Sequence, residues 1–200
     1  LFFISLIIFN YAGLIINLIS PGLDNLTSNL AASQLKIMSP IIFFSGLIGT
    51  GFGYLNTQNK YFISTISPMI SSICITLIVG IAWINKLNNF SLLSIHINTS
   101  LIIAWATLIG AFLQWITQLI IFIEPIKINF KYLWKKNNQL KNVFRIIFPA
   151  VFSSGMLQIN VFTDLFFASN IVGAAAALSY SGFIVQTPLG LLSSSIIIPL

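Results

Sequence analysis

Long apolar stretches alternate with short polar ones along the whole chain. A helix that crosses a bilayer needs roughly 20 predominantly apolar residues, and six stretches reach about that length. They cover residues 2–19, 37–55, 61–84, 101–123, 143–169 and 171–198. Backbone groups in lipid must be satisfied within their own segment, and these stretches lack the alternation of barrel strands. The pattern therefore predicts an all-α fold, a polytopic bundle of about six transmembrane helices in one membrane domain.

Pro40, Pro149 and Pro188 lie at or within predicted spans. Proline removes a backbone N–H and kinks a helix. We expect a helix kink at each position. Kinks beside polar faces suit a bundle that moves between states, while bends fixed only by packing are the alternative.

Composition excludes a soluble enzyme. Of the 200 residues 57% are hydrophobic and only 6% are charged, against about 25% charged in soluble domains. No glycine-rich phosphate loop is present, so no cofactor is expected. Cys74 is the single cysteine and can form neither an intrachain disulfide nor a metal site alone. An intramembrane enzyme would need paired acids or metal ligands within the spans, and none pair.

The positive charge gathers between the fourth and fifth spans, in the loop 124–142 and just after it. Its six cations are Lys127, Lys131, Lys135, Lys136, Lys141 and Arg145. Cytoplasmic loops carry such an excess, so this loop is predicted to be cytoplasmic, and alternation places residues 21–33 and 85–100 outside. The net charge of +6 is therefore a topology signal and predicts no nucleic-acid partner. Binding of anionic lipid headgroups is a further option for the loop.

Asp164 is the one acidic residue inside a span, and Asn160 lies one helical turn before it. A carboxylate in lipid is costly, so Asp164 should face a cavity or a partner. With Gln158, these residues are candidates for a substrate or ion path. Oxygen ligands alone suit a hard cation such as sodium, and no other metal site is expected. A position at the outer membrane edge, or a structural pairing of Asp164, is the alternative.

Two further positions carry candidate path residues. Gln114 and Gln118 share one face of the fourth span with Thr107 and Gly110; they line the path or make interhelical hydrogen bonds. Lys36 precedes the second span, where its stem can lie along the apolar edge while its charge reaches the interface.

Several motifs resemble those of one membrane-protein family. They are FPA at 148–150, QIN at 158–160 with Asp164, ALSY at 177–180, QTPLG at 186–190, and earlier LKIMSP at 35–40 and GYLN at 53–56. In this order the series resembles helices of the MurJ/MviN family of lipid II flippases, a branch of the multidrug/oligosaccharidyl-lipid/polysaccharide flippase superfamily. The chain would correspond to helices three to eight of about fourteen, a fragment with further chain on both sides.

The resemblance implies alternating-access movement of an undecaprenyl-pyrophosphate-linked peptidoglycan precursor across the cytoplasmic membrane of a bacterium. Its implied partners are that lipid-linked glycan precursor, membrane lipids and a coupling cation, and it suggests Lys36 as a cavity or gate cation. Many members carry an Asp-Arg pair where this chain has Gly182 and Phe183. The exact cargo therefore stays open, as does an organellar membrane in a plastid-bearing relative. The alternatives are a drug/cation antiporter, an O-antigen-type flippase, or a non-transporting scaffold subunit.

Overall fold

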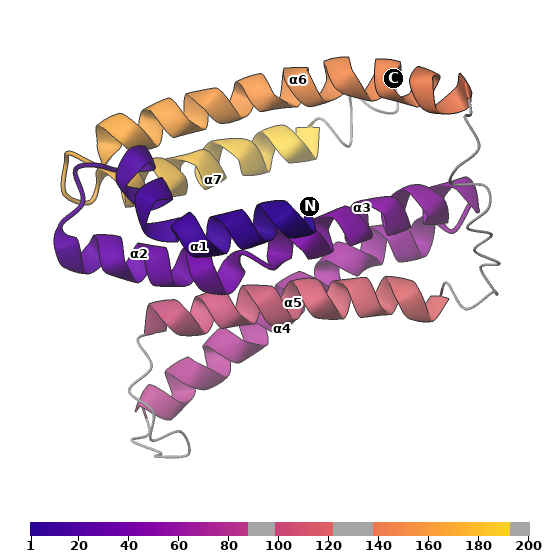
Figure 1. The fold of residues 1–200 in the computed structure, drawn as a ribbon. Coiled ribbons are helices and arrows are strands. Elements are labelled where there is room, and N and C mark those ends of the chain that lie inside the picture. The colour runs from indigo at the N-terminus through magenta and orange to yellow at the C-terminus, as the bar shows by residue number, and fades with distance from the viewer. Residues whose placement is uncertain (88–98, 122–137, 193–200) are drawn as a thin grey trace. The chain divides into compact units, whose positions relative to one another are not determined.

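The computed structural model describes residues 1–87, 99–121 and 138–192, which form seven α-helices and no strand. The helices are α1 Phe2–Ile19, α2 Asn25–Met38, α3 Ile41–Thr57, α4 Tyr61–Leu87, α5 Thr99–Ile121, α6 Asn138–Ala168 and α7 Ala174–Leu192 (Figure 1). Five of them are long and apolar enough to cross a membrane, and the bent pair α2–α3 can supply a sixth span. The predicted all-α fold of a polytopic helix bundle is confirmed.

Helix α2 corrects the sequence prediction. Residues 21–33 were expected to be an outer loop, but the chain is helical from Asn25 to Met38. This helix falls short of the roughly 20 apolar residues of a spanning segment, because it is only 14 residues long and carries many polar side chains. Asp24 immediately precedes α2, and aspartate is a favoured residue at that position.

The break between α2 and α3 lies at Ser39 and Pro40, and the two helices meet at an angle of 42°. Pro40 has no N–H to continue the helical hydrogen bonds, so nearby carbonyl groups need other donors. The Ser39 hydroxyl donates to the carbonyl oxygen of Lys36 at 2.9 Å. The buried hydroxyl of Ser5, on α1, donates to the carbonyl oxygen of Ser39 at 2.8 Å. Two serine hydroxyls therefore supplement the long backbone hydrogen bonds at the bend, in which the N–H of Ser39 donates to Lys36 and that of Ile42 to Ser39, each at 3.3 Å.

The later helices differ from the apolar stretches mainly at their ends. Helix α6 begins at Asn138, so the last residues of the predicted loop 124–142 are helical, while residues 122–137 lie outside the described ranges. Helix α7 starts three residues later than its apolar stretch, and residues 193–200 also lie outside the described ranges. Pro149 and Pro188 lie inside α6 and α7.

The chain divides into two compact units. Unit 1 comprises residues 1–15 and 26–134, and unit 2 comprises residues 16–25 and 135–200. In unit 1, helices α3, α4 and α5 pack against one another. In unit 2, α6 pairs with α7 through a turn in which Gly173 has φ = +81°, a conformation that favours glycine.

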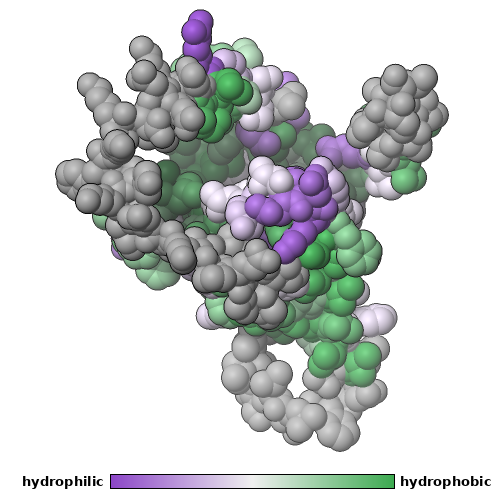
Figure 2. All heavy atoms as spheres, turned by 90° about the vertical axis from the view of Figure 1, so that its right-hand side faces the viewer, coloured by the Kyte–Doolittle hydropathy of each residue, from purple (hydrophilic) through white to green (hydrophobic). Residues whose placement is uncertain are grey.

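Large apolar side chains point outward in both units. Phe3 is 78% exposed, Phe62 77% and Phe148 73%. Among the coloured residues of Figure 2, hydrophobic ones form broad areas of the surface. In water such a surface would be very costly, whereas lipid is the matching solvent for helices whose backbone groups are bonded internally.

Candidate functional site

Close approach of α3, α4 and α5 depends on two glycines. A Cβ atom at Gly110 of α5 would lie 2.9 Å from the Ser71 hydroxyl oxygen and 3.1 Å from the Ser71 carbonyl oxygen. A Cβ atom at Gly51 of α3 would collide with Oε1 of Gln118. Small residues let helix backbones approach in membranes, where packing drives helix association. The two glycines therefore allow α5 to lie close to both α4 and α3.

Gln118 lies at the centre of this three-helix contact and is only 1% exposed. Its Nε2 donates to the hydroxyl oxygen of Ser67, on α4, at 3.0 Å. Its Oε1 is buried and has no hydrogen-bond partner in the described structure. The amide thus joins α5 to α4 with one end and presses on Gly51 of α3 with the other. Of its two expected roles, Gln118 takes the interhelical hydrogen bond.

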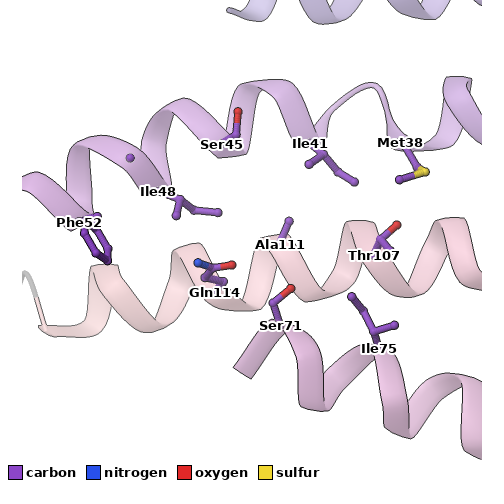
Figure 3. Close-up of a pocket in the computed structure, with 11 residues that line it drawn as sticks. Met38, Ile41, Ser45, Ile48, Phe52, Ser71, Ile75, Thr107, Ala111 and Gln114 are labelled. Atoms are coloured by element: carbon purple, nitrogen blue, oxygen red, sulfur yellow. The ribbon is translucent and has the colours of Figure 1, made fainter. Parts of the chain in front are cut away.

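A cavity of about 520 Å³ lies between the same three helices. Figure 3 shows Ile48 of α3 and Ala111 of α5 pointing into the space between them. Its lining residues are Met38, Ile41, Ser45, Ile48, Gly49, Phe52, Ser71, Ile75, Thr107, Ala111 and Gln114. The lining is neutral and mostly apolar.

Gln114 supplies the available amide in this cavity. The hydroxyl groups of Ser45 and Thr107 donate to carbonyl oxygens of their own helices, those of Ile42 and Ala104. Within the described structure the half-buried Gln114 amide has no such partner, and it lies between α3 and α5 in Figure 3. It can donate and accept a hydrogen bond, so the cavity can hold water or a neutral polar group.

The polar residues of α6 fall into two sets. Asn160 and Asp164 are one turn apart on one face of the helix, and both are exposed. Gln158 is exposed too, but a residue two positions from Asn160 points to the other side of a helix. The structure therefore supports a two-residue oxygen pair, and it separates Gln158 from that pair.

Lys36 is exposed in the last turn of α2. A cation at a helix C-terminus interacts favourably with the helix dipole. Of the predicted residues, Gln114 lines the cavity of unit 1 and Gln118 does not, while Asn160 and Asp164 lie one turn apart on α6 in unit 2. In the described ranges, no three His, Cys, Asp or Glu residues gather as they would around a metal ion.

Sequence reasoning missed three residues that shape these regions, namely Ser5, Ser67 and Gly51. Ser67 and Gly51 lie in helix-to-helix contacts, and Ser5 reaches the α2–α3 break. A search for small and hydroxyl residues inside the apolar stretches, which are enriched where membrane helices touch, would have raised all three as candidates.

Comparison with known proteins places the chain in a family. The family model described as "Lipid II flippase MurJ" matches residues 1–200, the full length of the chain. The chain belongs to the lipid II flippase MurJ family. It is a multi-pass membrane protein, as its apolar helices and its relatives both indicate.

Relatives from several bacteria resemble the chain. A probable lipid II flippase MurJ from Synechocystis sp. is 38% identical over 98% of this chain and 37% of the relative. A probable lipid II flippase MurJ from Rickettsia prowazekii is 30% identical over 80% of the chain and 29% of the relative. A lipid II flippase MurJ from Thermosipho africanus is 40% identical over 40% of the chain and 17% of the relative. The chain thus spans about a third of the first two relatives, and no solved structure matches it significantly.

Proposed function

We propose that the chain is part of a flippase that moves lipid II across the cytoplasmic membrane of a bacterium. The observation that carries this proposal is the match of the MurJ family model to all 200 residues. The physical features agree with it, because apolar helices line a cavity in which the Gln114 amide has no partner among the described residues. A polar headgroup crosses about 30 Å of hydrocarbon only where a protein offers it polar groups.

The basic segment gives the proposed flippase its orientation and an entry point for an anionic lipid. It is the loop 124–142 together with Arg145, and we place it on the cytoplasmic side. Clusters of lysine beside a membrane attract anionic headgroups. A pyrophosphate-linked precursor carries such charge, and Lys36, exposed at the end of α2, adds a further cation. Membrane lipids and the lipid-linked precursor are then the partners.

Transport against a gradient needs a driving force, and we assign this role to a cation at Asp164. Its carboxylate and the side-chain oxygen of Asn160 lie one turn apart on α6. Oxygen ligands suit a hard cation such as sodium. A charge that crosses the membrane potential supplies roughly 2.3 kcal/mol per 100 mV, so an ion-coupled cycle requires neither a nucleotide nor another cofactor.

Complementation tests the proposal. A bacterium is depleted of its own lipid II flippase and then expresses the full-length protein that contains this chain. We expect growth to recover, and lipid II to become accessible at the outer leaflet to an added enzyme that cleaves its headgroup. A full-length protein that inserts normally but leaves lipid II inside would contradict the proposed cargo. The same assay with other lipid-linked glycans then identifies or excludes a related cargo.

A further inference from the structure

Two turns that are distant in sequence touch in unit 2. The α1–α2 turn covers residues 20–24, and the α6–α7 turn covers residues 169–173. The backbone N–H of Gly22 donates to the hydroxyl oxygen of Ser169 at 3.2 Å. That hydroxyl donates its own proton to the carbonyl oxygen of Phe166 at 2.7 Å. The Ser169 oxygen therefore acts only as the acceptor in its bond with the Gly22 N–H.

Position 22 requires glycine because the α6–α7 turn lies so close to it, and not because of its own backbone conformation. A Cβ atom there would lie 2.6 Å from the carbonyl oxygen of Ser169 and 2.7 Å from the N and Cα atoms of Asn170. All three are backbone atoms, which cannot rotate away. Among the described glycines only Gly173 has a positive φ, so the conformation of Gly22 itself accepts alanine. An alanine at position 22 would destabilise the state in which the two turns touch, and it would cause no strain once they separate.

The burial of the α6–α7 hairpin is concentrated at this contact. Ala168 and Ser169 are each 6% exposed. All other residues of α6, α7 and their turn whose burial the structure describes are half-buried or exposed. The Gly22–Ser169 hydrogen bond has a net worth of only about 1 kcal/mol. A close-fitting contact that buries only two residues of the hairpin can both close and open.

We propose that Gly22 and Ser169 form a latch that closes the outer face of the transporter and separates when the path opens to that side. The side follows from the chain direction. Helix α6 starts beside the basic loop, which we place in the cytoplasm, and its 31 residues span about 46 Å, so the latch lies at the opposite face. Packed contacts that switch between two arrangements underlie many such transitions. Only the link to lipid II rests on the proposed function; the opening itself can be measured without transport.

Cysteine labelling tests the latch in the full-length protein. Cys74 and any other native cysteine are replaced by alanine, and Ala168→Cys provides a buried reporter that leaves Ser169 intact. A membrane-impermeant maleimide is added to the outside of intact cells. We expect slow labelling, which Gly22→Ala accelerates at least about tenfold, equal to a shift of about 1.4 kcal/mol in the opening equilibrium. Gly155→Ala, where an added Cβ meets nothing within 4 Å, is the matched control and should leave the rate unchanged.

A second pair of variants guards against misfolding of the glycine variant. Ser169→Ala removes only the hydroxyl, and Ala168→Cys again serves as the reporter. Its labelling should accelerate by a smaller factor, about two- to fivefold. Equal labelling rates with and without Ser169→Ala would overturn the latch, as would labelling from the cytoplasmic side only. If the rates shift but no lipid II is flipped by the parent protein, the latch stands and the proposed cargo fails.

Discussion

Helices α3–α5 and the hairpin α6–α7 are built from similar amino acids but differ in how they are packed. In the apolar stretch with which α5 would cross a membrane, 22% of the residues are buried. In the corresponding stretches of α6 and α7, none is buried. The first group holds its helices together with glycines at contact points and a buried amide. The second leaves Asn160 and Asp164 exposed. Overall hydrophobicity therefore does not reveal where a membrane helix is packed; the position of small and hydrogen-bonding residues does.

The largest expected effect compares one glycine from each region. Gly51→Leu should destabilise the protein by about 3 kcal/mol or prevent folding, because a large side chain would be forced against the buried Gln118. Gly155→Leu on α6 should have little effect, because its surroundings are open. Thermal unfolding of the detergent-purified protein, followed by size-exclusion chromatography, measures both. Equal melting temperatures for the two variants would show that the packing difference is not real.

A double-mutant cycle sharpens the comparison at Gln118. Ser67→Ala leaves the buried amide without an acceptor and should cost about 1 kcal/mol. Adding Gln118→Leu removes the unpaired amide as well and should recover most of that loss. Ser154→Ala on α6 is the control, because that exposed hydroxyl bonds only to its own helix. A double variant that is less stable than the sum of the single variants predicts would contradict this account.

Much of this architecture followed from the sequence. The apolar run of α1 predicted its range, because length and hydrophobicity suffice to mark a spanning helix. They could not mark α2, which is short and polar. Spacing placed Gln114 and Gln118 on one face, but periodicity does not say what a face touches, so the contact with Ser67 came only from the structure. Gly22 gave no local signal because its partner lies 147 residues away.

In the second region the expected effect is on transport and not on stability. Asp164 is exposed and bonds to no other described residue, so Asp164→Asn should insert and fold normally. Loss of the charge should reduce flipping several-fold and weaken its dependence on sodium or on membrane potential. Lipid II flipping in vesicles with imposed ion gradients measures this, and Ser154→Ala is the control at an exposed position of the same helix. Normal flipping with unchanged ion dependence would leave Asp164 as a structural or interfacial residue.

The smallest effect is expected at Lys36. Its exposed side chain can reach the membrane interface, so Lys36→Ala should preserve insertion and change the melting temperature very little. Flipping activity separates its two interpretations. Full activity supports an interfacial anchor, whereas a loss of activity at normal abundance supports a cation that contacts the cargo. Lys36→Arg should restore activity in the second case, because it keeps the charge.

The serine-lined break between α2 and α3 has a consequence for the order of assembly. Helix α3 has 17 residues and spans about 26 Å, less than the roughly 30 Å of the hydrocarbon core. The crossing therefore includes the end of α2, and the break lies at membrane depth, where no water can bond to the carbonyl of the buried Ser39. That carbonyl accepts the backbone N–H of Ile42 at 3.3 Å and, at the shorter distance of 2.8 Å, the hydroxyl of Ser5 on α1. Helix α1 leaves the ribosome first. It is therefore made before α2 and α3, and its Ser5 hydroxyl is already in place when the bend forms.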